Sequence, residues 1–324
     1  MTGENPQDVA FDRVTGKFKV PSFFSHVHVR SLQLSSRALA PFGYFGISRV
    51  HSLLGKIFNA HGDTRVFEHA FSFTYPSNDY YWNRLLDVKW QYEPEIDIFL
   101  RAIAKVPFAF LDLGANFGYW SAHVGAGVYG KHLCVAVEPS TSAYEYLERN
   151  SVGLPNEVRT RRFAIDEISG KKIVLYGNRH AGRSIDENWA GASRMTSNEV
   201  ESVSIDQLVK NENIELKSTP LIVKLDVEGA ELRAIKGAAA VIAADSIFIV
   251  EDAERNDLSE AISVLHAELG CTVYVYQNHA FKRFSTREEI VAYKREMQSL
   301  QVVGLNMFVT KSPFWKNTLD ALSV

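Results

Sequence analysis

Residues 108–118 read FAFLDLGANFG, an apolar run that leads into a loop with two glycines. Phe108–Leu113 is the kind of short apolar strand that lies buried on both faces of a parallel sheet. Gly114 and Gly118 let the backbone come close to a bound ligand because glycine has no Cβ. The D-x-G-x-x-x-G spacing of residues 112–118 differs from the G-x-G-x-x-G of dinucleotide-binding proteins. It favours a ligand without a pyrophosphate, such as S-adenosylmethionine, and a plain tight turn is the alternative.

Around this loop, strands and helices alternate along the chain. Strands are expected at Phe108–Leu113, Leu133–Val137, Val158–Ile165, Leu221–Val227, Ile247–Val250, Thr272–Tyr276 and Val302–Thr310. Helical stretches at 141–150, 230–243, 257–268 and 286–297 lie between them. The alternation predicts an α/β fold with a doubly wound, mostly parallel, seven-stranded sheet. Residues 171–204 interrupt it and are expected to form an inserted antiparallel pair, Lys172–Tyr176 with Val200–Ser204.

Two further strand ends carry candidate ligand-binding residues. Glu138 follows the strand Leu133–Val137, where a carboxylate can accept hydrogen bonds from both ribose hydroxyls of an adenosine. Ala164, Ile165 and Asp166 end the third strand and could frame the adenine. Alternatively, Asp166 simply begins the turn into the inserted pair.

The second strong motif is residues 221–231, LIVKLDVEGAE. Lys224 and Asp226 interrupt an apolar strand two residues apart, so they lie on the same face. Because burying an unpaired charge is costly, such residues are paired or belong to a site. The fourth strand of an open α/β sheet lies beside the first, so Asp226 is expected to face the glycine loop. The alternative is that Lys224 pairs with Asp226, and that Glu228 and Glu231 only begin a helix.

Residues 1–91 read as an N-terminal extension that could cap a substrate, and residues 92–324 as the ligand-binding α/β domain with the inserted pair. A helix is expected at 46–60, another at 93–105, and a strand at 64–75 followed by a turn at 76–79. The aromatic segment 71–92 either packs in a core or stacks on sugar rings. The amphipathic stretch 46–60 either covers the domain or lies on a membrane.

Composition excludes several classes of protein. The chain has 324 residues, a formal net charge of −3 and only two cysteines. This charge argues against a dedicated nucleic-acid binder. Cys134 and Cys271 lie in apolar runs and are expected to be buried free thiols, which fits a reducing compartment. No signal-like N-terminus and no long apolar run are present, so a cytoplasmic protein is expected.

Together, the segments FLDLGANFGYWS, VEPS and VKLDVEGAELRAIKGA resemble the FkbM family of S-adenosylmethionine-dependent methyltransferases. The similarity extends over residues 92–311 and includes Tyr92-Glu93-Pro94. It implies a class I methyltransferase fold, Rossmann-like and with an antiparallel final strand, which suits Val302–Thr310. It also implies O-methylation of a sugar, glycolipid, polysaccharide or related natural product, so a small molecule or glycan is the expected partner.

The resemblance assigns candidate roles by position. The glycine-loop positions would bind the cofactor S-adenosylmethionine, mainly at its methionine end, with Glu138 at the ribose. The cofactor-binding candidates are Glu93, Asp112, Gly114, Asn116, Phe117, Gly118, Glu138, Ala164, Ile165 and Asp166. Asp226 and Glu228 fall in the family's acidic motif near the transferred methyl. Gly182-Arg183-Ser184 matches a short serine-containing loop only loosely.

Methyl transfer to an alcohol needs a base for the hydroxyl proton. The catalytic candidates are Asp226, Glu228 and His279, with Glu251 and Asp252 as further carboxylates at strand ends. The chain lacks the His and Cys spacing of metal ligands, so no metal is expected, although carboxylates can hold a divalent ion. Two other functions stay open: an oxidoreductase with a nucleotide cofactor and a non-catalytic glycan-binding module.

Overall fold

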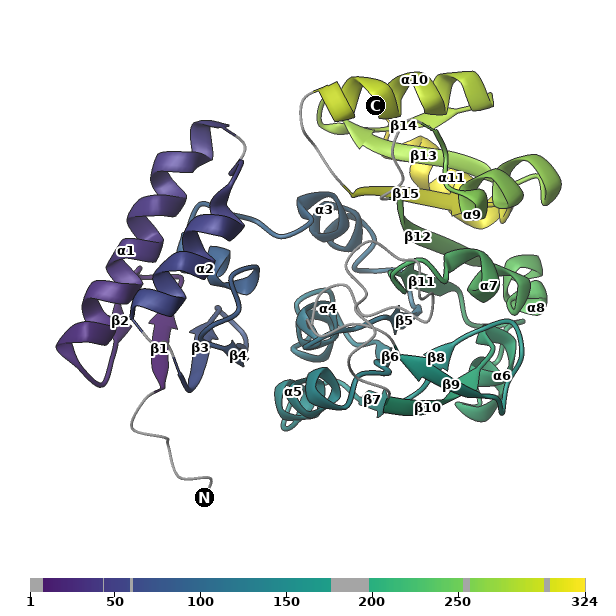
Figure 1. Ribbon diagram of the computed structural model, residues 1–324. Helices are drawn as coiled ribbons and strands as arrows, with labels where there is room; N and C mark the ends of the chain where they lie inside the picture. Colours follow the sequence, from purple (N-terminus) through teal and green to yellow (C-terminus); the bar gives the residue numbers. More distant parts are fainter. Residues whose placement is uncertain are drawn as a thin grey trace. The chain divides into compact units, whose positions relative to one another are not determined.

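The computed structural model describes residues 8–42, 44–58, 61–175, 198–252, 257–299 and 304–323. The chain divides into two compact units, Met1–Pro94 and Glu95–Val324 (Figure 1). The sequence places the corresponding boundary between residues 91 and 92. Glu93, predicted to bind the cofactor, therefore belongs to the N-terminal unit.

The N-terminal unit combines two helices with a four-stranded sheet in the order β2-β1-β3-β4. The helices are α1 (Phe23–Leu39) and α2 (Ile47–Ile57), and the strands are β1 (Val9–Asp12), β2 (Phe18–Lys19), β3 (Asp63–Phe67) and β4 (Ser72–Pro76). The prediction of one strand over 64–75 is wrong. The chain turns after β3, where the Glu68 N–H donates to the Phe71 carbonyl at 2.9 Å, and β4 returns antiparallel to β3.

Aromatic side chains form much of this unit's interior. Phe73, Tyr75 and Trp82 are buried, and the rings of Phe73 and Trp82 lie 4.9 Å apart. For these three residues, core packing rather than an exposed sugar-stacking surface is confirmed. Burial of large rings supplies much of the hydrophobic stabilisation of a small unit.

The second unit is built on an eight-stranded sheet in the order β14-β13-β15-β12-β11-β5-β6-β7. Its strands are β5 (Ala109–Leu113), β6 (Leu133–Val137), β7 (Val158–Arg161), β11 (Leu221–Leu225), β12 (Ser246–Asp252), β13 (Thr272–Gln277), β14 (Ala280–Phe284) and β15 (Leu305–Thr310). The pairs from β7 to β12 are parallel, whereas β15 runs antiparallel to both β12 and β13. This confirms the predicted class I methyltransferase fold with its antiparallel final strand. The prediction of seven strands missed β14, which forms a hairpin with β13.

The inserted pair is confirmed, although its surroundings differ from the prediction. β9 (Lys172–Leu175) pairs antiparallel with β10 (Asn198–Val203), and β8 (Ala164–Ile165) joins β10 in a separate three-stranded sheet. The predicted strand 158–165 is therefore two strands in two sheets. Gly182-Arg183-Ser184 lies outside the described residues.

Helices cover both faces of the large sheet (Figure 1). They are α3 (Pro94–Ala102), α4 (Tyr119–Gly125), α5 (Thr141–Ser151), α6 (Ile205–Asn211), α7 (Glu231–Lys236), α8 (Ala239–Ala243), α9 (Glu260–Ser263), a π-helical turn (Val264–Glu268), α10 (Arg287–Ser299) and α11 (Pro313–Ala321). The predicted helix 230–243 is broken at Gly237, where a Cβ would lie 2.6 Å from the Asp166 carbonyl oxygen. Both cysteines are buried and free, as predicted. Within the described residues, no helix is long and apolar enough to cross a membrane.

Candidate active site

The carboxyl ends of β5, β6 and β11 meet at one edge of the sheet, because these strands are parallel neighbours (Figure 1). Ligands of open α/β sheets bind at this edge, where the strand order reverses. In register, Lys224 on β11 lies beside Asp112 on β5. The two motifs singled out in the sequence are therefore brought together.

The glycine loop packs directly on the end of β11. Gly114 has a φ of +83°, and a Cβ there would lie 1.8 Å from the Asp226 carbonyl oxygen. The Asp226 N–H donates to the Leu113 carbonyl at 3.0 Å, so the predicted proximity of Asp226 and the loop is confirmed. Gly118 has a φ of +84°, and its Cβ would meet the Leu147 side chain at 2.5 Å. Both glycines thus make room for neighbouring protein atoms, where the sequence suggested room for a ligand.

Glu138 connects the first two strand ends. Its Oε2 accepts a hydrogen bond from the Asn116 N–H at 2.9 Å, and its Oε1 accepts one from the Ser140 N–H at 2.8 Å. The side chain is buried, so the carboxylate is held in one position at the edge.

Two other predicted positions in this loop are committed to the protein interior. Asp112 is buried on β5, and its Oδ2 accepts a hydrogen bond from the Ser121 N–H at 3.1 Å, which ties β5 to the first turn of α4. Phe117 is fully buried, with its ring 5.0 Å from that of Tyr146. The side chains of Asp112 and Phe117 therefore fix the shape of the loop.

The residues after β7 also have structural partners. Ala164 and Ile165 are buried in β8. Asp166 is fully buried and accepts hydrogen bonds from Arg233 Nε at 2.7 Å and Nη2 at 2.6 Å. This bidentate ion pair joins the end of β8 to α7. The Asp166 carboxylate is therefore engaged in an ion pair, while the backbone here stays near the sheet edge.

At the end of β11, the buried Lys224 pairs with Asp226, with Nζ and Oδ2 3.0 Å apart. The Asp226 side chain keeps 19% of its surface exposed, compared with 3% for Lys224. The pairing proposed from the sequence is present, and the Asp226 side chain is only partly buried.

Glu231 also lies at this edge, and the sequence did not predict it as a residue of the site. Its Oε1 accepts hydrogen bonds from the N–H groups of Val227 and Gly229, both at 3.2 Å. Burial, reinforced by the negative charge of Asp226, raises the pKa of Glu231 to about 7, against the opposing effect of the backbone hydrogen bonds. The sequence signal was a glutamate two residues after a glycine that follows a charged strand end.

Both loops at this edge contain a residue in the left-handed backbone region. Asn116, after β5, has a φ of +52°, and Glu228, after β11, has a φ of +50°. Asparagine adopts this region readily, whereas it is unfavourable for glutamate. Backbone strain of this kind clusters at functional sites, so Glu228 marks the loop after β11.

Three other residues that the sequence predicted or considered have different surroundings. His279 is exposed in the two-residue turn between β13 and β14, three strand positions from β11, which corresponds to about 14 Å. Glu93 belongs to the N-terminal unit. The buried Asp252 pairs with Lys294 of α10. His279 was attractive in the sequence only because it follows a strand.

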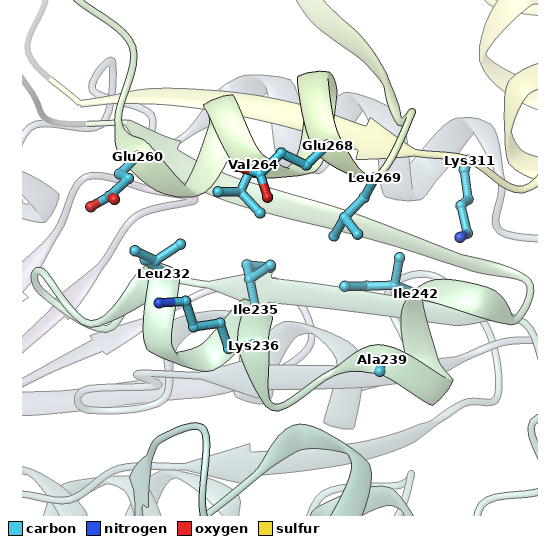
Figure 2. Close-up of a pocket in the computed structure, with 10 residues that line it drawn as sticks. All are labelled: Leu232, Ile235, Lys236, Ala239, Ile242, Glu260, Val264, Glu268, Leu269 and Lys311. Atoms are coloured by element: carbon cyan, nitrogen blue, oxygen red, sulfur yellow. The ribbon is translucent and has the colours of Figure 1, made fainter.

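A separate pocket of about 470 Å³ lies between the α7–α8 segment and the α9 region (Figure 2). Its walls include Leu232, Ile235, Val264 and Leu269, with charged side chains such as Lys236 at its rim. None of the predicted site residues lines it. Across the described ranges, no group of three or more His, Cys, Asp or Glu side chains is arranged to hold a metal ion.

Comparison with known proteins points to one family. The model of the methyltransferase FkbM domain matches residues 112–285, more than half of the chain, including the glycine loop and the acidic strand end. No curated protein sequence matches the chain.

Three solved structures show distant similarity. TYW2 from M. jannaschii in complex with AdoMet is 15% identical, with a TM-score of 0.34 over 77% of this chain and 84% of that one. A SAM-dependent O-methyltransferase from Thermotoga maritima is 14% identical, with a TM-score of 0.34 over 80% and 81%. A precorrin-6y C5,15-methyltransferase from Geobacter metallireducens is 9% identical, with a TM-score of 0.29 over 68% and 89%. These scores are too low to carry an argument, so the fold rests on the observed strand order.

Proposed function

The chain belongs to the FkbM methyltransferase family, and from that premise we propose that it transfers a methyl group to a hydroxyl oxygen. The proposed acceptor is a sugar, glycolipid, polysaccharide or related natural product. The observation that carries the proposal is the contact between the glycine loop and the acidic end of β11, where Asp226 and Glu231 interact. Membership of this methyltransferase family rules out the alternative of an oxidoreductase.

The residues at the edge fit the family's methyl donor, S-adenosylmethionine, which supplies a methyl group activated by a sulfonium. Glu138 presents a fixed carboxylate, the group that suits the vicinal hydroxyls of a ribose. Asn116 and Gly114 shape the loop between this carboxylate and Asp226. We assign Glu138 to ribose binding and this loop to the opposite end of the donor.

Methyl transfer to a hydroxyl acceptor requires a base, and the acidic end of β11 can provide one. An alcohol holds its proton tightly, so a base must accept that proton as the new bond forms. A base works best when its pKa lies near the working pH. Asp226 is already paired with Lys224, whereas Glu231 has the raised pKa. We therefore assign proton removal to Glu231, and to Asp226 the role of raising its pKa.

The test is a screen of glycan and glycolipid acceptors with S-adenosylmethionine labelled in the methyl group. The label should be recovered in an alkali-stable methyl ether formed at a hydroxyl oxygen of the acceptor. The Glu231→Gln variant should react about 10²-fold more slowly with the same acceptor. Arg162→Gln, which alters an exposed side chain bonded to Thr141, is the matched control and should react normally. Label recovered only on nitrogen would overturn the proposal.

A further inference from the structure

The helical face of the N-terminal unit exposes an unusual number of large apolar side chains. Phe23, Phe24, Leu34, Phe42, Phe45 and Leu53 are between 59% and 77% exposed. They come from α1, from α2 and from the segment that joins the two helices, which pack side by side (Figure 1). Large apolar side chains that are exposed on neighbouring elements are typical of an interaction site.

The same stretch of chain is strongly basic. Residues 13–62 contain seven Lys and Arg residues and no Asp or Glu, although the whole chain has a net charge of −3. Seven of the ten Lys and Arg residues in 1–94 therefore lie in this stretch, and all the acidic residues of 1–94 lie outside it.

Basic and apolar side chains share the exposed face of each helix. On α1, Leu34 lies between Arg30 and Arg37 at spacings of four and three residues, and all three are exposed. On α2, exposed Leu53 lies between Arg49 and Lys56 at the same spacings. Such spacings place residues on one side of a helix. The opposite sides are buried, with Val29 and Leu32 on α1 and Ile47 and His51 on α2.

We propose that this face, defined by the exposed residues of α1 and α2, binds the surface of an anionic lipid bilayer. Phenylalanine and leucine side chains enter the boundary between headgroups and acyl chains, and flanking basic residues attract anionic headgroups. Helices α1 and α2 have 17 and 11 residues, too short to span a bilayer, so they lie along its surface. The absence of acidic residues from 13–62 removes the repulsion that such a surface would meet.

The test is co-sedimentation of the full chain with two kinds of vesicle: pure phosphatidylcholine, and phosphatidylcholine with roughly one-third phosphatidylglycerol. Wild type should bind the anionic vesicles at least tenfold more tightly, and added salt should weaken the binding. The Arg37→Glu, Arg49→Glu, Lys56→Glu variant should lose about fivefold or more for each residue changed. The Phe23→Gln, Phe24→Gln variant should lose binding to both vesicles.

Matched controls lie on the other unit. Val152→Gln changes a side chain that is 79% exposed, and Lys217→Glu reverses an exposed charge, and neither should alter vesicle binding. Circular dichroism confirms that each variant is folded. Lack of binding by wild type, or equal losses in the controls, would overturn the proposal. So would a wild-type dimer that the Phe23 and Phe24 changes convert to monomer, since a second copy would then cover the face. The readout is binding, so it is independent of methyl transfer.

Discussion

Neighbouring strands β11 and β12 both end in a lysine–aspartate ion pair, and the two pairs have opposite surroundings. At β12, the side chains of Asp252 and Lys294 are 0% and 2% exposed. Asp252 also accepts a hydrogen bond from the Ser259 N–H, and Lys294 donates to the Asp257 carbonyl. At β11, Asp226 keeps 19% of its surface exposed. The same type of ion pair is thus fully buried at the end of β12 and partly exposed at the end of β11.

The origin of each lysine explains the difference. Lys224 lies on β11 only two residues before Asp226, so this pair is local in the sequence. Lys294 comes from α10, 42 residues after Asp252, and holds that helix to the end of β12. A carboxylate is made structural by partners distant in the chain, and such partners are the ones that a sequence does not reveal.

The largest expected effect is on the closed pair. Lys294→Met leaves the Asp252 carboxylate buried without its cation, which should lower the free energy of unfolding by about 3–5 kcal/mol. Denaturant titration measures this loss, with Lys217→Met, at an exposed lysine, as the control. A change below about 1 kcal/mol would remove the distinction between the two strand ends.

A smaller effect is expected at the end of β6, where Glu138 is assigned to the ribose. Glu138→Ala removes a charged acceptor and should weaken binding of S-adenosylhomocysteine by about 1.5–3 kcal/mol. Calorimetry measures the affinity. The affinity of Glu138→Gln, whose side chain keeps the shape of glutamate and one acceptor oxygen, should fall between the affinities of wild type and Glu138→Ala. Wild-type affinity in the alanine variant would remove Glu138 from the site.

The smallest expected effect is a pH dependence of stability that comes from Glu231. Its pKa is raised from the ordinary 4.5 to about 7, so the folded chain binds more protons than the unfolded chain between these values. The contribution of Glu231 to stability is therefore present at low pH and is lost as pH rises through about 7. Thermal unfolding from pH 4.5 to 7.5 should show this fall in wild type relative to Glu231→Gln. Parallel curves for the two proteins would show that Glu231 titrates normally.

The sequence carried most of the fold because the relevant signals are local. A short apolar run such as Leu133–Val137 predicts a buried strand, and the alternation of such runs with helices leaves few topologies. The split of residues 158–165 between β7 and β8 was missed because it depends on pairing with β10, about 40 residues later. The hairpin of β3 and β4 was missed because the change of phase in the alternation between Val66 and Phe71, which marks the turn, was read through as one strand.

The candidate site was predicted in part for the same reason. The sequence predicted that Asp226 lies beside the glycine loop, because the loop and Asp226 each follow an apolar strand and these two strands were expected to be neighbours. The sequence could not show that Arg233 engages Asp166, or that His279 lies in a turn far from β11. Nor could it show the pKa of Glu231, which depends on burial and on the charge of Asp226.

The assignment of the base to Glu231, at the acidic end of β11, is tested most directly by the pH dependence of single-turnover methyl transfer to the acceptor found in the screen. For wild type, the rate should rise with pH through about 7, as the Glu231 carboxyl loses its proton. Glu231→Gln should lose this rise and react about 10²-fold more slowly, while Asp226→Asn should move the rise to lower pH. Asp252→Asn should keep the wild-type profile per folded molecule. A Glu231→Gln enzyme that retains the rise near pH 7 would contradict the assignment of the base to this strand end.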